Sequence, residues 1–208
     1  MSGFSTCRIL FAVIISLSVT VSSVGAQSSP PPASIESMVA ALPDERLVGM
    51  WKRVQSEAGW PVAATMIGLQ FTMGIIVDKD DSEAVRWYRI AANGGYADAQ
   101  WRLAAQHAVG EGVLQDFVLA HMWFTLAAEQ DHAEAQLRLG AQYAVGQGVP
   151  QDFVLAHMWL NLASAQDLEK PHLMAGKARD VVEKAMTPEQ VIEAKARARA
   201  WRLTTECR

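Results

Sequence analysis

Histidines that recur at a fixed spacing are the first residues here that could do chemistry, because imidazole is a common metal ligand. His121 and His157 lie 36 residues apart, each within the same stretch VLAHMW. If both stretches are neighbouring helices, their backbones lie about 8–10 Å apart, so the two rings could share a metal ion. No carboxylate or cysteine recurs beside them at this period, and zinc usually needs three or four protein ligands. We therefore expect no metal site, and we expect the scattered His107, His132 and His172 to face solvent.

Two glycine pairs could be mistaken for phosphate-binding loops. Gly110-x-Gly112 and Gly146-x-Gly148 each fall between two expected helices, whereas a phosphate loop joins a strand to a helix. They are better explained as helix exits, in which glycine takes the left-handed conformation. The sequence also contains no HExxH, CxxC, SxxK, GxSxG or Walker-type motif. We expect no catalytic residues and no cofactor.

Binding of another protein is the chemistry that the sequence favours, because side chains at equivalent positions form rows. The rows are Arg86, Met122 and Met158; Arg89, Thr125 and Asn161; and Val85, His121 and His157. Methionine suits an adaptable binding surface, although it also fills gaps in cores. We predict that these rows line a groove on the concave face of the molecule and accept a peptide or partner loop. Plain solvated surface is an equally good interpretation of any single residue.

The elements that position these rows follow from a repeat of 36 residues. The positions that share this spacing include Asp44, Asp80, Asp116 and Asp152, and Trp51, Trp87, Trp123 and Trp159. The last two copies are nearly identical, since VGEGVLQDFVLAHMW at 109–123 returns as VGQGVPQDFVLAHMW at 145–159. A fixed period of roughly 20–50 residues is typical of a solenoid.

Each copy reads as two helices. In the first copy, Leu47, Trp51, Val54 and Ala58 share one helix face, and Gly59 ends that helix. In the second copy, Asp80 or Asp81 can cap the first helix. Further helices are expected at residues 34–42, 62–73, 97–109 and 191–203, and the fourth copy is expected to run on to residue 186. The first helices of the pairs are expected to line the concave face.

Alanines and tryptophans are expected to divide the packing between them. Ala91, Ala99, Ala127 and Ala135 are small enough for two helices to approach near the short end of the usual separation of roughly 8–10 Å. The repeated indoles fill the wider gaps between successive pairs. We expect each pair to bury one indole against the next, so that the repeats depend on their neighbours.

The N-terminal residues read as an export signal. Arg8 precedes the largely apolar run 9–21, and Val24-Gly25-Ala26 offers small residues for cleavage. The run is too short for a membrane anchor, which needs roughly 20 apolar residues. We expect residues 1–26 to be a signal peptide, the protein to be periplasmic or secreted, and no membrane span to remain. Cys207 is then the only cysteine, so a disulfide could form only between chains.

The rest of the chain divides into three parts. Residues 27–43 form a Ser/Pro linker, QSSPPPA, followed by a short helix. Residues 44–186 form the solenoid. Thr187-Pro188-Glu189-Gln190 is a capping box that begins a final helix, so residues 187–208 are expected to cap the exposed end of the core.

The charge pattern argues against nucleic acid as a partner. The chain has a formal net charge of −4, and residues 80–165 carry ten acidic and four basic side chains. Binding of phosphates needs clustered Lys and Arg. Residues 166–208, with seven acidic and nine basic side chains, are too mixed to reverse this conclusion.

The pattern Leu139-Gly140-x-x-Tyr143-x-x-Gly146-x-Gly148-Val149-x-x-Asp152, with Ala120-x-x-Trp123 and Ala127-Ala128, resembles the Sel-one-like repeat family. The resemblance is strong over residues 80–163 and weaker over residues 44–79. It implies an all-α, right-handed α/α superhelix of about four repeats, export in bacteria and a role in assembling other proteins. A cysteine-rich branch of the family is associated with β-lactams, but its paired cysteines are missing here.

Two alternatives to a protein-binding scaffold stay open at this point. One is a hydrolase of the cell envelope directed at β-lactams or peptidoglycan, although the sequence shows no reactive constellation. The other is a structural spacer that assembles end to end without a dedicated ligand. The identity of a partner and the oligomeric state do not follow from the sequence.

Overall fold

The computed structural model describes residues 33–166 and 169–205, and every regular element among them is a helix. The expected signal peptide, most of the linker and Cys207 lie outside the described residues. The helices are α1 (Ala33–Ala40), α2 (Glu45–Ala58), α3 (Trp60–Met73), α4 (Asp81–Asn93), α5 (Ala97–Val109), α6 (Phe117–Ala128), α7 (Ala133–Val145), α8 (Phe153–Ala163), α9 (Glu169–Glu183) and α10 (Pro188–Thr205). The expected all-α solenoid is confirmed, and α9 ends three residues before the expected Met186.

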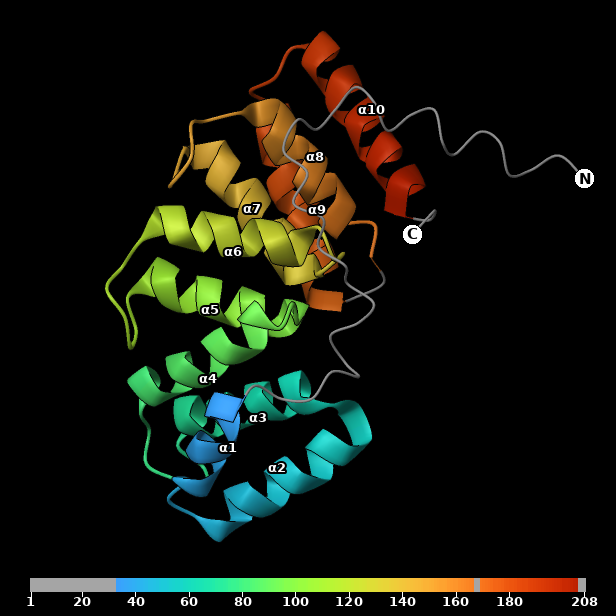
Figure 1. Cartoon of the computed structure of the whole chain (residues 1–208). Helices are drawn as coiled ribbons and strands as arrows, with labels where there is room; N and C mark the ends of the chain where they lie inside the picture. Colours follow the sequence, from blue (N-terminus) through green and yellow to red (C-terminus); the bar gives the residue numbers. More distant parts are fainter. Residues whose placement is uncertain (1–32, 167–168, 206–208) are drawn as a thin grey trace, which may run out of the picture.

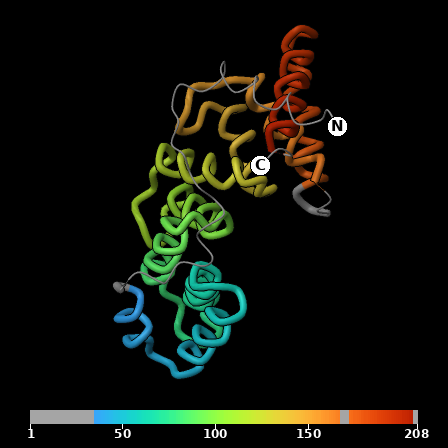
Figure 2. The backbone as a smooth tube through the Cα atoms, turned by 45° about the vertical axis from the view of Figure 1, so that its right-hand side comes forward, coloured from blue at the N-terminus to red at the C-terminus, as the bar shows by residue number. Residues whose placement is uncertain are grey.

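The helices succeed one another along the molecule from α2 at one end to α10 at the other (Figure 1). The tube in Figure 2 shows the same progression from the blue N-terminal helices to the red C-terminal ones. The closest pairs are α3 with α4, α5 with α6, and α7 with α8. Copies counted from the repeated aspartates group α4 with α5. This grouping is wrong about which helices are closest, because α4 packs most closely on α3.

Small residues explain why these pairs are close. A Cβ on Gly68 of α3 would lie 2.6 Å from the ring of Tyr88 in α4, and one on Gly140 of α7 would lie 2.7 Å from Leu160 in α8. Ala104, at the equivalent position of α5, is fully buried. A larger side chain at these three positions would push the two helices of a pair apart.

The repeated aspartates begin the helices as expected. The carboxylate of Asp80 accepts from the backbone N–H of Glu83 at 2.9 Å, and that of Asp152 accepts from Leu155 N–H at 2.9 Å. Each of these aspartates also donates its own backbone N–H to a carbonyl of the preceding helix, Phe71 or Tyr143. The aspartate therefore fixes both the start of its helix and the path of the loop that leads into it.

Buried alanines and indoles form the core between the helices. Ala91, Ala99, Ala127 and Ala135 are all fully buried, so these small side chains lie between packed helices. Trp51, Trp87 and Trp159 are also buried, and the rings of Trp51 and Trp87 are 5.8 Å apart. Trp123 is only half-buried and packs against both the N-terminal and the C-terminal apolar clusters. The expectation of four equally buried indoles is wrong at this position.

A row of glutamines links successive repeats through the interior. The side-chain amides of Gln100 and Gln136 donate to the carbonyls of Ala92 and Ala128, both at 3.2 Å. Gln130 donates to the Gln100 side chain at 2.8 Å, and the equivalent bond from Gln166 to Gln136 is 2.9 Å. These bonds satisfy polar groups at the ends of the helices, which would otherwise be costly to bury.

The last helix leaves the regular pattern. The capping box is confirmed, because Thr187 N–H donates to the side chain of Gln190 and Gln190 N–H donates to the Thr187 hydroxyl. Helix α10 packs on α8 and makes little contact with α9. The rings of Trp201 and Trp159 meet edge to face at 5.0 Å. Helix α10 therefore folds back over the fourth copy instead of extending the stack.

Candidate functional site

The rows expected to bind a partner come from α4, α6 and α8, and the structure leaves five of their side chains accessible. Arg86 and Arg89 of α4 are exposed, and Met122 of α6 is 56% exposed. Thr125 of α6 and Asn161 of α8 are half-buried. Equivalent positions on neighbouring helices thus change from basic on α4 to apolar on α6.

Three other residues of the rows are buried. His157 is fully buried, Met158 is 6% exposed and Val85 is 2% exposed. Helix α10 covers Met158, whereas His157 faces the end of α9, where its Nε2 lies 3.0 Å from a carboxylate oxygen of Glu183. The expectation that these side chains line an open groove is wrong. Helices α9 and α10 lie against His157 and Met158 of α8, whereas Val85 of α4 is part of the N-terminal apolar core.

His121 remains half-buried between α6 and α7. Its Nδ1 lies 3.2 Å from the side-chain oxygen of Gln142, and its ring meets Tyr143 edge-on at 5.1 Å. Burial lowers the pKa of His121 below its usual value of 6.5, and the contact with Gln142 opposes this shift. His121 and His157 therefore have separate partners. No group of three His, Cys, Asp or Glu side chains that could hold a metal occurs within residues 33–166 and 169–205.

The lowered pKa of His121 predicts a pH dependence of stability. In the unfolded chain this imidazole takes up its proton near pH 6.5, before the folded protein does. Stability is therefore lost as the pH falls through 6.5 towards the lower pKa of the folded state. We expect the wild type to lose stability relative to His121→Gln between pH 7.5 and pH 5.5. Paired thermal melts of the two proteins measure this, and a difference that is flat or of opposite sign would contradict it.

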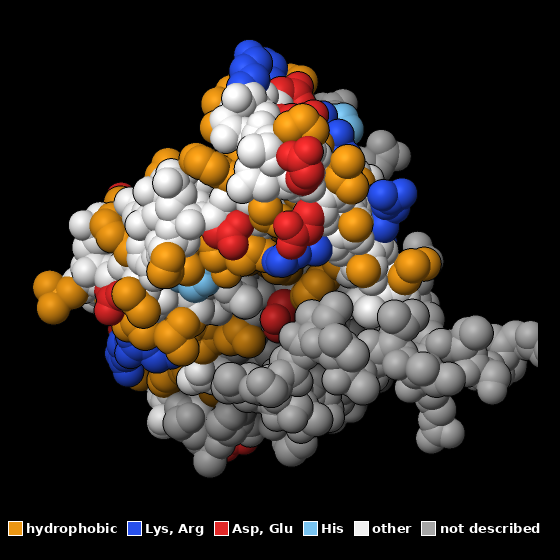
Figure 3. Space-filling model, turned by 90° about the horizontal axis from the view of Figure 1, so that it is seen from above, with side chains coloured by type: hydrophobic (Ala, Val, Ile, Leu, Met, Phe, Trp, Pro, Cys, Tyr) orange, Lys and Arg blue, Asp and Glu red, His pale blue; other side chains and the backbone are white. Residues whose placement is uncertain are grey.

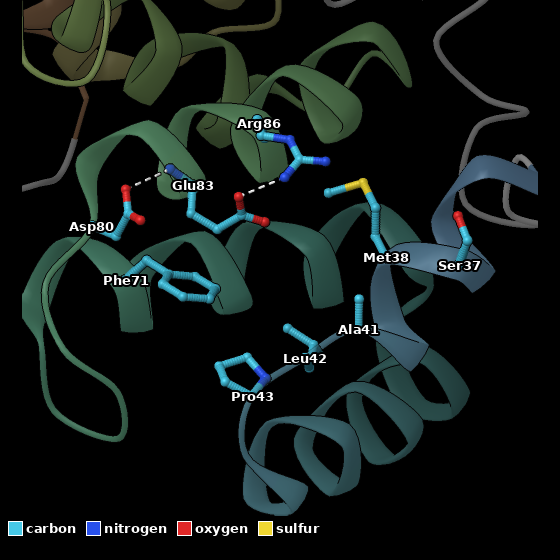
Figure 4. A pocket seen from close by; sticks show the side chains of 9 residues that line it. All are labelled: Ser37, Met38, Ala41, Leu42, Pro43, Phe71, Asp80, Glu83 and Arg86. Carbon is cyan, nitrogen blue, oxygen red and sulfur yellow. Dashed lines mark hydrogen bonds and ion pairs between the residues drawn. The ribbon is translucent and has the colours of Figure 1, made fainter.

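Arg86 also stands at the rim of a shallow hollow of about 440 Å³ between α1 and α4 (Figure 4). Met38, Leu42 and Phe71 supply apolar side chains, and Arg86 forms an ion pair with Glu83 at 2.7 Å. The Arg86–Glu83 ion pair thus lies beside apolar side chains. The hollow lies between the accessible residues of α4 and helix α1.

The remaining histidines differ from expectation in two of three cases. His107 is buried at 7% exposure, so the expectation that it faces solvent is wrong. His132 is half-buried, where it accepts from Ala135 N–H at the start of α7 and stacks on Trp101 at 5.5 Å. His172 is exposed, as expected.

A cluster around Trp101 was not found from the sequence. Arg102 lies over the Trp101 ring at 5.1 Å and donates to Asp98 at 2.8 Å, while His132 approaches Asp98 at 3.7 Å. Burial raises the pKa of Asp98, but hydrogen bonds from His132 and Arg102 outweigh it and hold the pKa below its usual value. These groups satisfy one another, which indicates a structural cluster. The recurrence of acid and Arg at 98/102 and 134/138 is the signal that could have revealed it.

Exposed apolar side chains along α6 were also missed. Leu114, Val118 and Met122 are 91%, 58% and 56% exposed and lie at i, i+4 and i+8. Seen from the α10 end, the surface mixes such hydrophobic side chains with charged ones (Figure 3). Val118 and Met122 lie one turn apart on α6, and Leu114 lies in the loop before it, so the spacing of the first two could have revealed the helical part of this stripe. A stripe of this kind is a common feature of protein-binding surfaces.

In the described part of the chain, no helix combines the length and the apolar character that crossing a membrane requires.

Comparison with known proteins places the chain in a family. The model of the Sel1 repeat matches residues 61–96, 97–132 and 133–168. These three units contain α3 with α4, α5 with α6, and α7 with α8, which are the closest helix pairs of the structure. No curated protein matches the chain.

Two solved structures resemble this one. The protective antigen c5321 of uropathogenic Escherichia coli, which displays an SLR fold, is 30% identical with a TM-score of 0.64 over 73% of this chain. A Sel1 repeat protein from Oxalobacter formigenes is 33% identical with a TM-score of 0.50 over 51% of this chain. The matches span 31% and 44% of those two longer chains.

Sel1 repeat proteins are generally scaffolds for protein interaction and are typically not enzymes. The three matched units cover about half of the sequence, and their helix pairs are those of the structure. The chain therefore belongs to the Sel1 repeat family.

Proposed function

We propose that the chain is an exported bacterial scaffold, periplasmic or secreted, that binds another protein or peptide through the accessible face of α4, α6 and α8. The observation that carries this proposal is that accessible side chains recur at equivalent positions of these three helices. Arg86 and Arg89 of α4 correspond to Met122 and Thr125 of α6, and Thr125 corresponds to Asn161 of α8. The N-terminal sequence, with Arg8 before an apolar run, supports export.

The chemistry of this face suits a partner that is both acidic and apolar. Arg89 has no ion pair among the described side chains, whereas Arg86 is held by Glu83. An unpaired guanidinium can form bidentate hydrogen bonds with a carboxylate of a partner. Exposed Met122 on α6 offers an adaptable apolar contact. The family match does not favour the hydrolase or the spacer alternative.

Replacing Arg86, Arg89 and Asn161 together with Ala is expected to abolish capture of the partner from a bacterial envelope extract. All three side chains are accessible, so each substitution should change the free energy of unfolding by no more than roughly 0.5 kcal/mol, as is usual for surface residues. The melting temperature should therefore change little. Capture by the immobilised chain, followed by quantitative mass spectrometry, compares wild type and variant.

A matched control replaces two arginines and one amide elsewhere on the surface, with Arg53→Ala, Arg138→Ala and Gln147→Ala. All three side chains are exposed. The control variant should capture the same protein as the wild type does. If the first triple variant retains full capture, or if both variants lose it equally, the binding face lies elsewhere.

A further inference from the structure

One helix of this chain already shows how a helix packs on the first helix of a repeat. Helix α10 lies along α8, where Ala198 and Trp201 pack in one apolar cluster with Met158, Trp159 and Leu162. Ala194 and Ala198 are fully buried. Two alanines one turn apart permit close approach of the backbones, and Trp201 then fills the space beside Trp159.

The face of α8 that receives α10 has a copy on α6. The four residues Leu155, Met158, Trp159 and Leu162 of α8 correspond, 36 residues earlier, to Leu119, Met122, Trp123 and Leu126 of α6. Each pair is identical in residue type. The two helices therefore carry the same four apolar side chains at the same spacing along the helix.

The two copies differ in what covers them. Met158, Trp159 and Leu162 are only 4–6% exposed beneath α10. On α6, Met122 is 56% and Leu119 is 38% exposed, and Trp123 and Leu126 are half-buried. Exposed Val118 and Leu114 continue this surface to the start of α6 and into the loop before it.

Charges beside the open copy constrain what could cover it. Helix α6 contains no Asp, Glu, Lys or Arg between Phe117 and Ala128. One copy earlier, α4 exposes Arg86 and Arg89 at the positions equivalent to Met122 and Thr125. A helix that lies on α6 and extends towards α4 would therefore meet apolar side chains on α6 and basic ones on α4.

We propose that the exposed face of α6 is a second, open docking site for a helix of the α10 type, supplied by a partner protein. Its occupant is an amphipathic helix with two small residues one turn apart, an aromatic residue one turn further on, and acidic side chains along the edge that faces α4. The covered copy on α8, which is part of the same surface, is the template for this contact. The inference rests on the proposed function and names the kind of partner.

Two synthetic peptides test the site against the full chain by fluorescence anisotropy. One has the sequence of residues 187–205, and in the other Arg197, Arg199 and Arg202 are replaced with Glu. We expect saturable binding of the acidic peptide and weaker binding of the native one. Met122→Glu should weaken binding of the acidic peptide at least about tenfold, as for a residue at the centre of an interface. Met73→Glu is the control, since Met73 is 59% exposed at the end of α3.

Several outcomes would overturn the proposal. One is that neither peptide binds. Another is that the Met122→Glu variant binds the acidic peptide as well as the wild type does, which is the result expected if the peptide only displaces α10 from α8. A dimer in sedimentation velocity that Met122→Glu abolishes, without peptide binding, would assign the face to a second copy of the chain. Failure here leaves capture through Arg86, Arg89 and Asn161 as a separate result, so the two proposals fail independently.

Discussion

Replacing Trp87 with Ala should destabilise the folded chain more than any other single truncation of an indole. Trp87 is fully buried between the first and second copies, and its ring lies 5.8 Å from that of Trp51. Truncation of a buried Trp costs roughly 3–5 kcal/mol, because apolar contacts are lost and a cavity remains. For a domain of this size, this corresponds to a fall in melting temperature of roughly 6–20 °C.

Trp123→Ala provides the matched comparison, since Trp123 occupies the equivalent position one copy later and is only half-buried. We expect it to destabilise the chain clearly less than Trp87→Ala. Thermal and denaturant unfolding, followed by circular dichroism, measure both. Because repeats can unfold in parts, each transition should also be followed by a second probe. Equal losses in the two variants would mean that burial of the indole does not set its contribution.

The period of 36 residues was sufficient to predict the helices of the repeats, whereas the limits of α9 and α10 differ from those expected. Asp80 and Asp152 cap helices because a carboxylate satisfies the free N–H groups of a first turn, and this depends only on local sequence. The buried alanines such as Ala91 and Ala127 followed from the same period. Features that depend on residues within one or two turns could therefore be predicted.

The candidate site was predicted only in part, because coverage depends on distant elements. Met122 and Met158 have the same neighbours in sequence, yet one is exposed and the other lies beneath α10. The residues on either side of the two methionines are the same, His and Trp, so the local sequence does not distinguish them. The difference comes from α10, whose Trp201 packs against Trp159.

Polar groups inside the stack were missed for a different reason. Gln100 and Gln136 repeat at the period, but glutamine is mostly a surface residue, so its recurrence alone does not indicate burial. In the structure both are buried and satisfy carbonyls at the ends of α4 and α6. A polar residue that recurs at the repeat period beside a helix end is thus a signal for a bond between helices.

Gly112→Ala is the second substitution expected to destabilise the chain strongly. Gly112 has a backbone conformation that favours glycine, and there is no space for a Cβ at this position. Gly112 has a φ of +71°, a left-handed conformation that costs a residue with a Cβ about 1–3 kcal/mol. A Cβ there would also overlap the backbone carbonyl of Asp81 at the start of α4. Relief of such a clash requires movement of backbone, which adds about 1–3 kcal/mol.

Two glycines of the same chain separate these contributions. Gly95 has a φ of +85° but no atom within 4 Å of a built Cβ, so Gly95→Ala should show the conformational cost alone. Gly176 lies inside α9 with open space around it, so Gly176→Ala should be neutral or stabilise the chain by roughly 0.5–1 kcal/mol. Unfolding in guanidinium chloride should therefore rank the variants in the order Gly176→Ala, Gly95→Ala, Gly112→Ala, from most to least stable.

This ranking bears on how the repeats hold together. Gly148, one period after Gly112, makes the same approach to the carbonyl of Phe117 at the start of α6. Each glycine loop thus rests on the first turn of the previous capped helix, and only a residue without a side chain can lie there. If Gly112→Ala proves no worse than Gly95→Ala, the loop can move away without loss. Contact between loop and helix end would then not be what fixes the spacing of the repeats.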